Sequence, residues 1–451
     1  MLINKFLTMG LLKFDGSQLP SVLKFLKSRE YQPLESNEKI QKKRLKKLLI
    51  HCYENVPYYH DVLVESGVMV GNEVDLTKFS NIPVLTKEII REHFEDLKSK
   101  DTDERKWYLN TSGGSTGEPV KFLQDNVSWD HGMAGKWFFS TFAGKDISDK
   151  EVKLWGSERD VLKGSIGFKA KIKNMIFNRV LLNSFRMSES DMREYVKTIN
   201  KKKPVIIEAY VQSIYELSKF IKNNNLEVYS PPGIITSAGT LYPEYQQLIE
   251  EVFGTKVYNR YGSREVGDMA CSCEKGEGLH LNLFHQYIEI LDDKGEPCKP
   301  GEIGQIHVTT LNNYVMPLIR YQIGDMAIPA ENEQCSCGRG LPLIKGVVGR
   351  QMDVFKTKNG RVVPGEFFIH FIGVVYNKDF ISKFQVVQKD YESVVIRLVL
   401  RDEIKFGSYK KKIIDSIKDV MGQDCKVEFE FVEDIEPTKS GKYRYTISEV
   451  K

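Results

Sequence analysis

Strand-like and helix-like segments alternate from about residue 105 to residue 330, and this alternation constrains the fold more than any other feature of the sequence. Runs rich in β-branched residues predict strands at 152–155, 205–209 and 233–236. Apolar residues at helical spacing predict helices at 214–223 and 242–253. Such alternation is typical of a sheet with helices packed on its faces, so the sequence predicts an α/β protein.

The chain of 451 residues is too long for one compact core, and its two ends differ from its centre. Residues 34–68 have helical periodicity, which Pro57 ends or bends. The pattern at 287–308, with a turn at 292–295, predicts a small antiparallel subdomain. Strand, helix and strand signals after residue 394 predict a separate α+β domain, so we expect a large domain over residues 1–349 and a small domain over residues 350–451.

Charge and hydropathy exclude several classes of protein. The 65 basic and 61 acidic residues give a formal net charge of only +4, which is too balanced for a protein whose main partner is nucleic acid. No apolar run is long enough to span a bilayer. Residues 1–14 lack a signal-peptide cleavage site and predict a helix docked on the body, with shallow membrane contact as the alternative. Seven cysteines without an export signal indicate a cytoplasmic protein.

The most informative motif is a loop rich in glycine and hydroxyl side chains. Glycines let backbone N–H groups approach an anion closely, and hydroxyls add donors to phosphate oxygens. The Gly-Lys-Ser/Thr tripeptide of a Walker loop is absent, which argues against a P-loop NTPase, and alone such a loop is more often a surface turn. The loop consists of Thr111, Ser112, Gly113, Gly114, Ser115, Thr116 and Gly117.

Four further motifs follow this loop, at residues 261–265, 320–325, 349–353 and 437–442. Together the five motifs resemble the acyl-adenylate-forming superfamily of acyl-CoA synthetases, peptide-synthetase adenylation domains and luciferases. Local matches at 56–59, 82–87 and 262–267 are similar to the phenylacetate–CoA ligase branch, especially its relatives linked to capsular polysaccharide synthesis. The resemblance implies a large N-terminal domain with layered α/β sheets and an antiparallel subdomain, followed by a small mobile α+β domain.

The resemblance also implies a reaction in two steps. ATP and Mg²⁺ would convert a carboxylic acid to an acyl-adenylate with release of pyrophosphate, and the acyl group would then pass to CoA or a related acceptor. The glycine-rich loop would hold the phosphates, and Glu265 would bind Mg²⁺, which prefers carboxylate and phosphate oxygens. The nucleoside would contact Ser237, Ala238, Gly239, Tyr261, Gly262, Ser263 and Asp325, with Asp325 on the ribose hydroxyls.

Three residues of the last two motifs complete the implied site. Arg350 would contact the ribose and phosphate region, and Asp353 would lie at the hinge about which the small domain rotates between the two steps. Lys442 would bridge the carboxylate and the α-phosphate as charge develops. The implied catalytic residues are therefore Lys442, Glu265 and Arg350.

A cluster of cysteine and histidine forms a second constellation. Four thiolates or imidazoles typically bind a structural Zn²⁺ in a tetrahedral shell. The spacing alone leaves unrelated cysteines and histidines as an equally good interpretation. The resemblance favours Cys273, His280, Cys335 and Cys337, and leaves open whether Cys271 joins them.

The sequence leaves several alternatives open. Glu118 stands where many relatives carry Lys, and Met352 replaces the first Asp of the hinge motif, so activity could be lowered or lost. One alternative is transfer to an amine or sugar acceptor in polysaccharide biosynthesis, and another is a non-catalytic nucleotide-binding protein. The acid pocket would include residues 129–142 and 210–215, although aromatic stripes are more often core. The acid, the acceptor and the oligomeric state, with a dimer among the options, stay undetermined.

Overall fold

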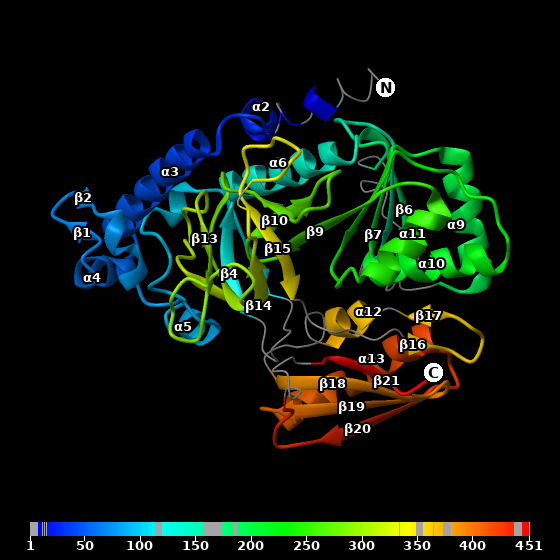
Figure 1. The fold of residues 1–451 in the computed structure, drawn as a ribbon. Helices are drawn as coiled ribbons and strands as arrows, with labels where there is room; N and C mark the ends of the chain where they lie inside the picture. Colours follow the sequence, from blue (N-terminus) through cyan, green and yellow to red (C-terminus); the bar gives the residue numbers. More distant parts are fainter. Residues whose placement is uncertain are drawn as a thin grey trace.

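One mixed sheet of eleven strands forms the centre of the molecule (Figure 1). Its order is β12-β13-β14-β15-β11-β10-β9-β8-β7-β5-β6, so the strands at its middle come from the middle of the chain. The computed structural model describes residues 8–10, 12, 14, 16–112, 120–156, 174–184, 187–332, 334–348, 355–363, 365–372, 380–436 and 444–450.

The half of the sheet from β6 to β9 is parallel, and it confirms the predicted alternation. Both β7 and β8 are buried on every residue, as expected for strands covered on two faces. One face packs on three helices, α9 (Glu189–Lys202), α10 (Val211–Asn223) and α11 (Pro243–Phe253). The parallel strands are β5 (Glu151–Trp155), β6 (Arg179–Asn183), β7 (Ile206–Tyr210), β8 (Gly233–Ser237) and β9 (Val257–Ser263).

The opposite face of this half packs on α6 (Asn126–Phe142), a helix that the sequence did not predict. Asp125 caps its first turn by accepting a hydrogen bond from the Ser128 amide. Phe138, Phe139 and Phe142 are buried in the core that α6 shares with α2 (Leu19–Arg29), so these aromatic residues serve packing. In Figure 1, α6 runs along the sheet on the side away from α10 and α11.

The antiparallel half continues the same sheet beyond β9. The strands expected as a small subdomain therefore join the parallel half through β9, which pairs with β8 on one side and β10 on the other. Gly295 closes the predicted turn through its amide, which donates to the Asp292 carbonyl at 3.0 Å. These strands are β10 (Gly267–Ser272), β11 (Leu279–Leu281), β12 (Gln286–Leu291), β13 (Gly304–Thr310), β14 (Tyr321–Pro329) and β15 (Leu343–Val348).

Helices of the N-terminal region cover the antiparallel half. Pro57 ends α3 (Leu34–Asn55) and starts α4 (Pro57–Glu65), which confirms its predicted role as a break. Thr8 is buried and donates to the Ile176 carbonyl at 3.2 Å, so the described part of the first segment lies on the body. The remaining elements of this region are β1 (Met69–Val70), β2 (Glu73–Val74), η1 (Leu76–Asn81), α5 (Lys87–Glu92), η2 (Thr102–Glu104), β3 (Trp107–Thr111) and β4 (Lys121–Asp125).

Residues from 355 onward form sheets of their own, as the sequence predicted for the C-terminal part. The larger sheet has the order β20-β19-β18-β21 and packs on α13 through buried residues such as Ile413, Ile417 and Val420. Figure 1 places it beneath the eleven-stranded sheet. Its elements are β16 (Phe355–Lys356), β17 (Val362–Val363), α12 (Gly365–His370), β18 (Ile381–Asp390), β19 (Ser393–Leu400), α13 (Glu403–Met421), β20 (Lys426–Phe431) and β21 (Thr446–Ser448).

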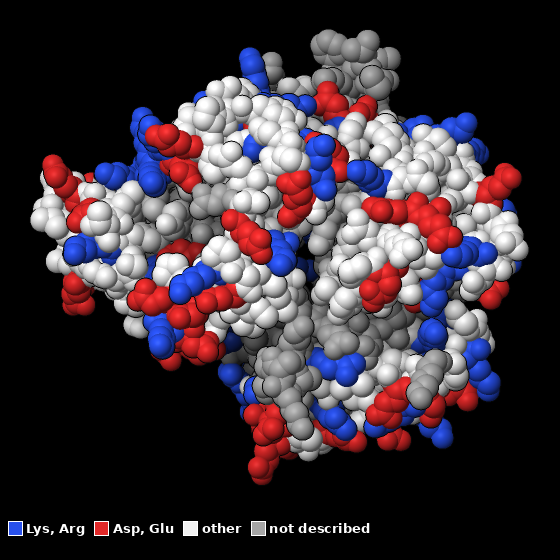
Figure 2. Space-filling view, in the orientation of Figure 1, with Lys and Arg blue, Asp and Glu red and all other residues white. Residues whose placement is uncertain are grey.

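The surface has mixed charge. Figure 2 shows Lys and Arg side chains interspersed with Asp and Glu side chains over the visible face, in agreement with the formal net charge of +4. None of the described helices combines the length and the apolar character that crossing a bilayer requires.

A close backbone contact ties the N-terminal helices to the far end of the sheet. The Gly340 amide donates to the Glu30 carbonyl at 2.8 Å, and the Asn37 side chain donates to the Gly340 carbonyl at 2.7 Å. A Cβ atom at residue 340 would lie 1.6 Å from the Gln32 carbonyl oxygen. Only glycine therefore allows this approach.

We expect Gly340→Ala to destabilise the fold, because the added methyl group forces the two backbones apart. Overpacking of this kind typically costs about 1–3 kcal/mol of the free energy of unfolding, measured by chemical denaturation. Gly407→Ala is the control, since its Cβ in α13 would meet nothing within 4 Å and should stabilise the helix. Equal stability of Gly340→Ala and the parent chain would contradict this account of the contact.

Candidate functional site

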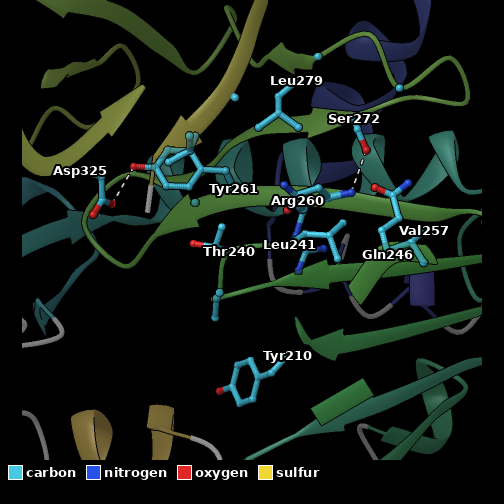
Figure 3. Close-up of a pocket in the computed structure, with 18 of the residues that line it drawn as sticks. Tyr210, Thr240, Leu241, Gln246, Val257, Arg260, Tyr261, Ser272, Leu279 and Asp325 are labelled. Atoms are coloured by element: carbon cyan, nitrogen blue, oxygen red, sulfur yellow. Dashed lines mark hydrogen bonds between the residues drawn. The ribbon is translucent and has the colours of Figure 1, made fainter. Parts of the chain in front are cut away.

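A cavity of about 700 Å³ opens beside the sheet where the parallel and antiparallel halves meet (Figure 3). Its walls come from the loop after β8, from β9 and the turn that follows it, and from β14 and β15. Ligands of open α/β sheets bind at the carboxyl ends of parallel strands, which is the position of this cavity. The described site residues that line it are Ala238, Gly239, Tyr261, Gly262, Ser263, Glu265 and Asp325.

A direct hydrogen bond joins two of the predicted nucleoside contacts. The Tyr261 hydroxyl donates to Asp325 Oδ2 at 2.9 Å, as Figure 3 shows. The two residues lie on β9 and β14, 64 positions apart in the chain. The tyrosine ring offers a flat surface to a base, and the carboxylate offers acceptors to hydroxyl groups. This pairing fits the contacts expected for the base and the ribose of a nucleotide.

The loop after β8 forms the wall facing this pair. Ala238 has a φ of 59°, a left-handed backbone conformation that a residue other than glycine rarely adopts. It follows Ser237, which is buried at the end of β8, and precedes Gly239. In Figure 3, Thr240 and Leu241 of the same loop lie near Tyr261. The turned backbone at these residues therefore borders the cavity.

Glu265 lies on the tight turn between β9 and β10, and close strand packing fixes this turn. A Cβ atom at residue 262 would lie 2.7 Å from the Gly267 carbonyl oxygen, so only glycine fits there. The Gln124 side chain on β4 donates to the carbonyl of Glu265 at 3.1 Å and anchors the turn. Glu265 is only 8% exposed and borders the cavity, where its carboxylate could supply one oxygen to Mg²⁺ beside phosphate oxygens.

The base of the glycine-rich loop is a closed hairpin. The Ser112 amide donates to the Val120 carbonyl at 2.9 Å, and the Val120 amide donates to the Ser112 hydroxyl at 2.8 Å. Thr111 ends β3 at the same place. Several predicted site residues lie outside the described residues, namely Gly113, Gly114, Ser115, Thr116, Gly117, Arg350, Asp353 and Lys442.

The structure brings the four predicted metal ligands together, although they come from three separate stretches of chain. Their ligand atoms all lie within 4.8 Å of one another, and the cluster contains Cys273 rather than Cys271. Sγ of Cys273 lies 3.6 Å from Sγ of Cys335, and Sγ of Cys337 lies 3.4 Å from Nε2 of His280. Tetrahedral Zn²⁺ would set such sulfur–sulfur and sulfur–nitrogen distances at about 3.8 Å and about 3.6 Å.

The chemistry of these side chains also fits zinc. Burial lowers the pKa of His280 to about 4, with a further contribution from Arg339, so its imidazole is neutral at pH 7 and can bind a metal. Burial raises the pKa of the Cys273 thiol, so the thiolate needs a bound cation to form there. Backbone amides of Lys275 and Arg339 point at two of the sulfur atoms, as is common around metal-bound thiolates.

Arg339 connects this cluster to the rest of the fold. Its guanidinium donates to Glu30 at 2.7 Å and to Glu274 at 2.8 Å, and it lies 4.2 Å from the centre of the Phe142 ring. The cluster therefore joins the ends of β10 and β11 to α6 and to the N-terminal helices. Since β9 pairs with β10, the same clamp supports the strand that carries Tyr261.

Sequence reasoning missed a second group of buried polar residues near the cavity. Lys136, Lys153 and Arg260 surround the carboxylate of Glu208, which is 1% exposed. The signal was available, because Glu208 and Lys153 are charged residues inside otherwise apolar strands, where a charge is rare unless it is paired. Their partners come from other segments, so the sequence alone did not identify the group.

Comparison with known proteins agrees with the site. A family model described as the CapK C-terminal domain matches residues 355–449. Protein CapK from Staphylococcus aureus is 25% identical over 426 residues, which cover 91% of this chain and 89% of CapK. A phenylacetate-coenzyme A ligase from Thermus thermophilus is also 25% identical over 426 residues, covering 88% of this chain and 93% of that protein.

The chain is a relative of the phenylacetate–CoA ligases and CapK. The predicted resemblance to the acyl-adenylate-forming superfamily, and to its phenylacetate–CoA ligase-like branch, is thereby confirmed. A crystal structure of a 2-hydroxyisobutyryl-CoA ligase in complex with 2-HIB-AMP and CoA has a TM-score of 0.59 and 18% identity, covering 94% of this chain and 92% of that one. This likeness confirms the predicted fold of this phenylacetate–CoA ligase-like chain.

We expect Asp325→Ala to weaken ATP binding by about tenfold to a hundredfold, because hydrogen bonds to a charged group contribute about 1.5–3 kcal/mol. Isothermal titration calorimetry with ATP would measure the loss. Asp61→Ala, which removes an exposed carboxylate on α4, should bind ATP as the parent chain does. Unchanged affinity in Asp325→Ala would show that the nucleoside lies elsewhere.

Proposed function

We propose that this chain activates a carboxylic acid with ATP, forming an acyl-adenylate and pyrophosphate, and then transfers the acyl group to CoA. The carrying observation is that Tyr261, Asp325 and Glu265 meet in one cavity of a chain related to phenylacetate-coenzyme A ligase. The first two suit a nucleoside, and the third suits the Mg²⁺ that accompanies the phosphates. An AMP-forming acid–CoA ligase needs these elements side by side.

The first step brings two anions together, and the proposed residues offset their repulsion. Mg²⁺ held by Glu265 would supply charge neutralisation at the phosphates. The glycine-rich loop would donate backbone N–H groups to the departing pyrophosphate, and Arg350 would contact the ribose and α-phosphate. Lys442 would donate to the carboxylate and α-phosphate oxygens, so that the carboxylate attacks phosphorus in line with the leaving group.

The second step requires a change in the residues that face the cavity. We propose a large domain over residues 1–349 and a small domain over residues 350–451, which turns about Asp353 after adenylation. This rotation would withdraw Lys442 and open the adenylate to the thiol of CoA. The separate sheets after residue 355 support such a division, since the buried residues of their core, apart from Tyr210, all come from the C-terminal part.

A second candidate acceptor is an amine or a sugar. The similarity to CapK over most of the chain favours it, because the C-terminal residues 355–449 match a CapK family model. We propose that the C-terminal domain contributes to binding of the acceptor. A C-terminal domain of the CapK type would then bind the acceptor that CapK uses. Analysis of the products distinguishes the two acceptors. A CoA thioester formed in the presence of CoA supports CoA, and an amide or ester formed with an amine or a sugar supports the second candidate.

We further propose that Cys273, His280, Cys335 and Cys337 hold a structural Zn²⁺. Four protein ligands fill a tetrahedral shell, which leaves no position for substrate and excludes a catalytic role. Reduced thiols and millimolar ATP are properties of the cytoplasm, so we place the enzyme there.

Exchange of labelled pyrophosphate into ATP tests the adenylation step. We expect one class among aryl, fatty, hydroxy and amino acids to drive exchange in the parent chain. Lys442→Ala should lower its rate by at least about 10²–10³-fold, because a charge that stabilises the transition state is lost. Lys439→Ala, three residues earlier in the same motif, is the matched control and should keep the rate.

Exchange at the parental rate in Lys442→Ala would remove the assigned role of this lysine. ATP binding without exchange, for every acid offered, would instead favour the alternative of a non-catalytic nucleotide-binding protein, to which Glu118 and Met352 point. Both residues can be tested directly by Glu118→Lys and Met352→Asp, which restore the pattern of the family.

We expect the purified chain to contain one equivalent of zinc by elemental analysis. Cys335→Ser should lose the metal and unfold at a lower temperature, because the clamp between β10, β11 and the N-terminal helices is released. Cys298→Ser, which changes a cysteine outside the cluster, should keep both metal and stability. A parent chain that is fully folded and free of zinc would refute the proposed site.

A further inference from the structure

Three cationic side chains converge on one buried carboxylate between α6 and the parallel half of the sheet. The Lys136 ammonium lies 2.7 Å from Glu208 Oε1, and the Lys153 ammonium lies 3.1 Å from Oε2. The Arg260 guanidinium donates to Oε1 as well. These side chains come from α6, β5, β7 and β9, so the folded sheet itself assembles the group, which we name the Glu208 cluster.

Among the residues that the structure describes, positive charge exceeds negative charge in and around this cluster. Asp268, 3.1 Å from Arg260 Nε, is the second carboxylate, so two anions face three cations. The adjoining Glu151 is shared by Lys145 and Arg179, which adds one more cation than anion. An uncompensated buried charge destabilises the fold by several kcal/mol per ion. A surplus of buried cations is therefore best explained where a bound anion supplies the missing negative charge.

The guanidinium of Arg260 has an atom with no acceptor among the described residues. Arg260 is only 2% exposed, and its Nη1 atom has no hydrogen-bond partner among the residues that the structure describes. Burial lowers the pKa of the Lys153 ammonium to about 7, and Glu208 and Lys136 act on it in opposite directions. An anion arriving beside these groups would accept from the guanidinium and favour the charged form of the lysine.

Two aromatic rings in close, tilted contact connect the cluster to the cavity. Trp155 ends β5 and Tyr210 ends the adjacent parallel strand β7, and their ring centres lie 4.1 Å apart. The Lys153 and Lys136 ammonium groups lie 5.2 Å and 5.8 Å from the centre of the Trp155 ring. Tyr210 lines the cavity that contains Tyr261 and Asp325. A ligand that extends past Tyr210 from the nucleotide site therefore approaches both lysines.

The cluster also remains open to a ligand. The Lys136 side chain is 22% exposed and the Lys153 side chain 11%, although Glu208 and Arg260 are fully enclosed. On β9, Arg260 precedes Tyr261, and both residues line the cavity, so neighbouring residues of one strand serve the two sites. One elongated ligand can therefore reach both sites, with one end beside Tyr261 and Asp325 and the other end beside the Glu208 cluster.

We propose that the acid activated by this enzyme carries a second anionic group, most simply a carboxylate, which Lys136, Lys153 and Arg260 bind. This inference rests on the proposed function, since it assigns the cluster to the far end of the acid whose other carboxylate meets ATP. Phenylacetate has a single carboxylate, so the preferred substrate would differ from the acid in the name of the relatives. Two carboxylates at opposite ends allow one to react while the other fixes the position.

Pairs of acids that differ only by a carboxylate test the proposal. Suitable pairs are phenylacetate with 4-carboxyphenylacetate, and hexanoate with adipate. Binding is followed by calorimetry and by the fluorescence of Trp155, with Trp155→Phe to assign the signal, and pyrophosphate exchange is measured alongside. We expect the diacid to bind at least tenfold more tightly than the monoacid in one pair or more.

Variants of Lys136 show whether the cluster causes this preference. We expect Lys136→Met to reduce the ratio of diacid to monoacid affinity at least tenfold, and Lys136→Arg, which keeps the charge, to retain most of it. Glu208 keeps two cations in Lys136→Met and three in Lys136→Arg, and thermal unfolding checks that the fold is intact. Lys222→Met is the matched control, because this lysine pairs with Glu251 on the surface.

The outcomes separate this inference from the proposed function. A diacid preference that depends on Lys136, without any exchange, supports the anion site and contradicts adenylation. Exchange with monoacids and no diacid preference in any pair overturns the anion site and leaves adenylation standing. A Lys136→Met variant that loses monoacid and diacid binding equally, with an intact fold, also overturns it, because the lysine would then serve the structure alone.

Discussion

The pairing of β9 with β8 on one side and β10 on the other is the interaction on which the remaining structure depends. It is parallel toward β8 and antiparallel toward β10, and it fuses two differently built half-sheets into one. Strand β9 gives the cavity both Tyr261 and Arg260, and Arg260 also pairs with Glu208 in the Glu208 cluster. A shift of one residue in register would displace both side chains from their partners Asp325 and Glu208.

The surroundings of β9 hold this register from both ends. Gly262 allows the close approach of β10, and the turn that follows carries Glu265. Beyond β10, the Cys273 cluster and Arg339 tie the sheet to α6 and to the N-terminal helices. Stability and chemistry are therefore linked, since the proposed zinc site supports the strand on which the nucleotide contacts lie. The C-terminal part of the chain has a different core, to which Tyr210 of β7 contributes.

Much of this arrangement is readable from the sequence where local patterns carry the information. The strands β5, β7 and β8 and the helix α11 begin and end within two residues of their predictions, because apolar periodicity and flanking turns define them. The helix α6 was missed, since its glycines and aromatic residues hide the helical period. The ligand atoms of Cys273, His280, Cys335 and Cys337 do meet, whereas the Glu208 cluster was not foreseen, because Arg260 lies 52 residues from Glu208 and only the sheet joins them.

Transfer of oxygen from the acid to AMP tests the central claim most directly. The acid would be labelled with ¹⁸O in its carboxylate, and the nucleotide and phosphate products analysed by mass spectrometry after turnover with ATP and CoA. Attack of the carboxylate on the α-phosphorus predicts AMP that carries one ¹⁸O atom, with none in pyrophosphate. Label in inorganic phosphate, with ADP as the nucleotide product, would mean attack on the γ-phosphorus and would contradict the adenylate-forming account.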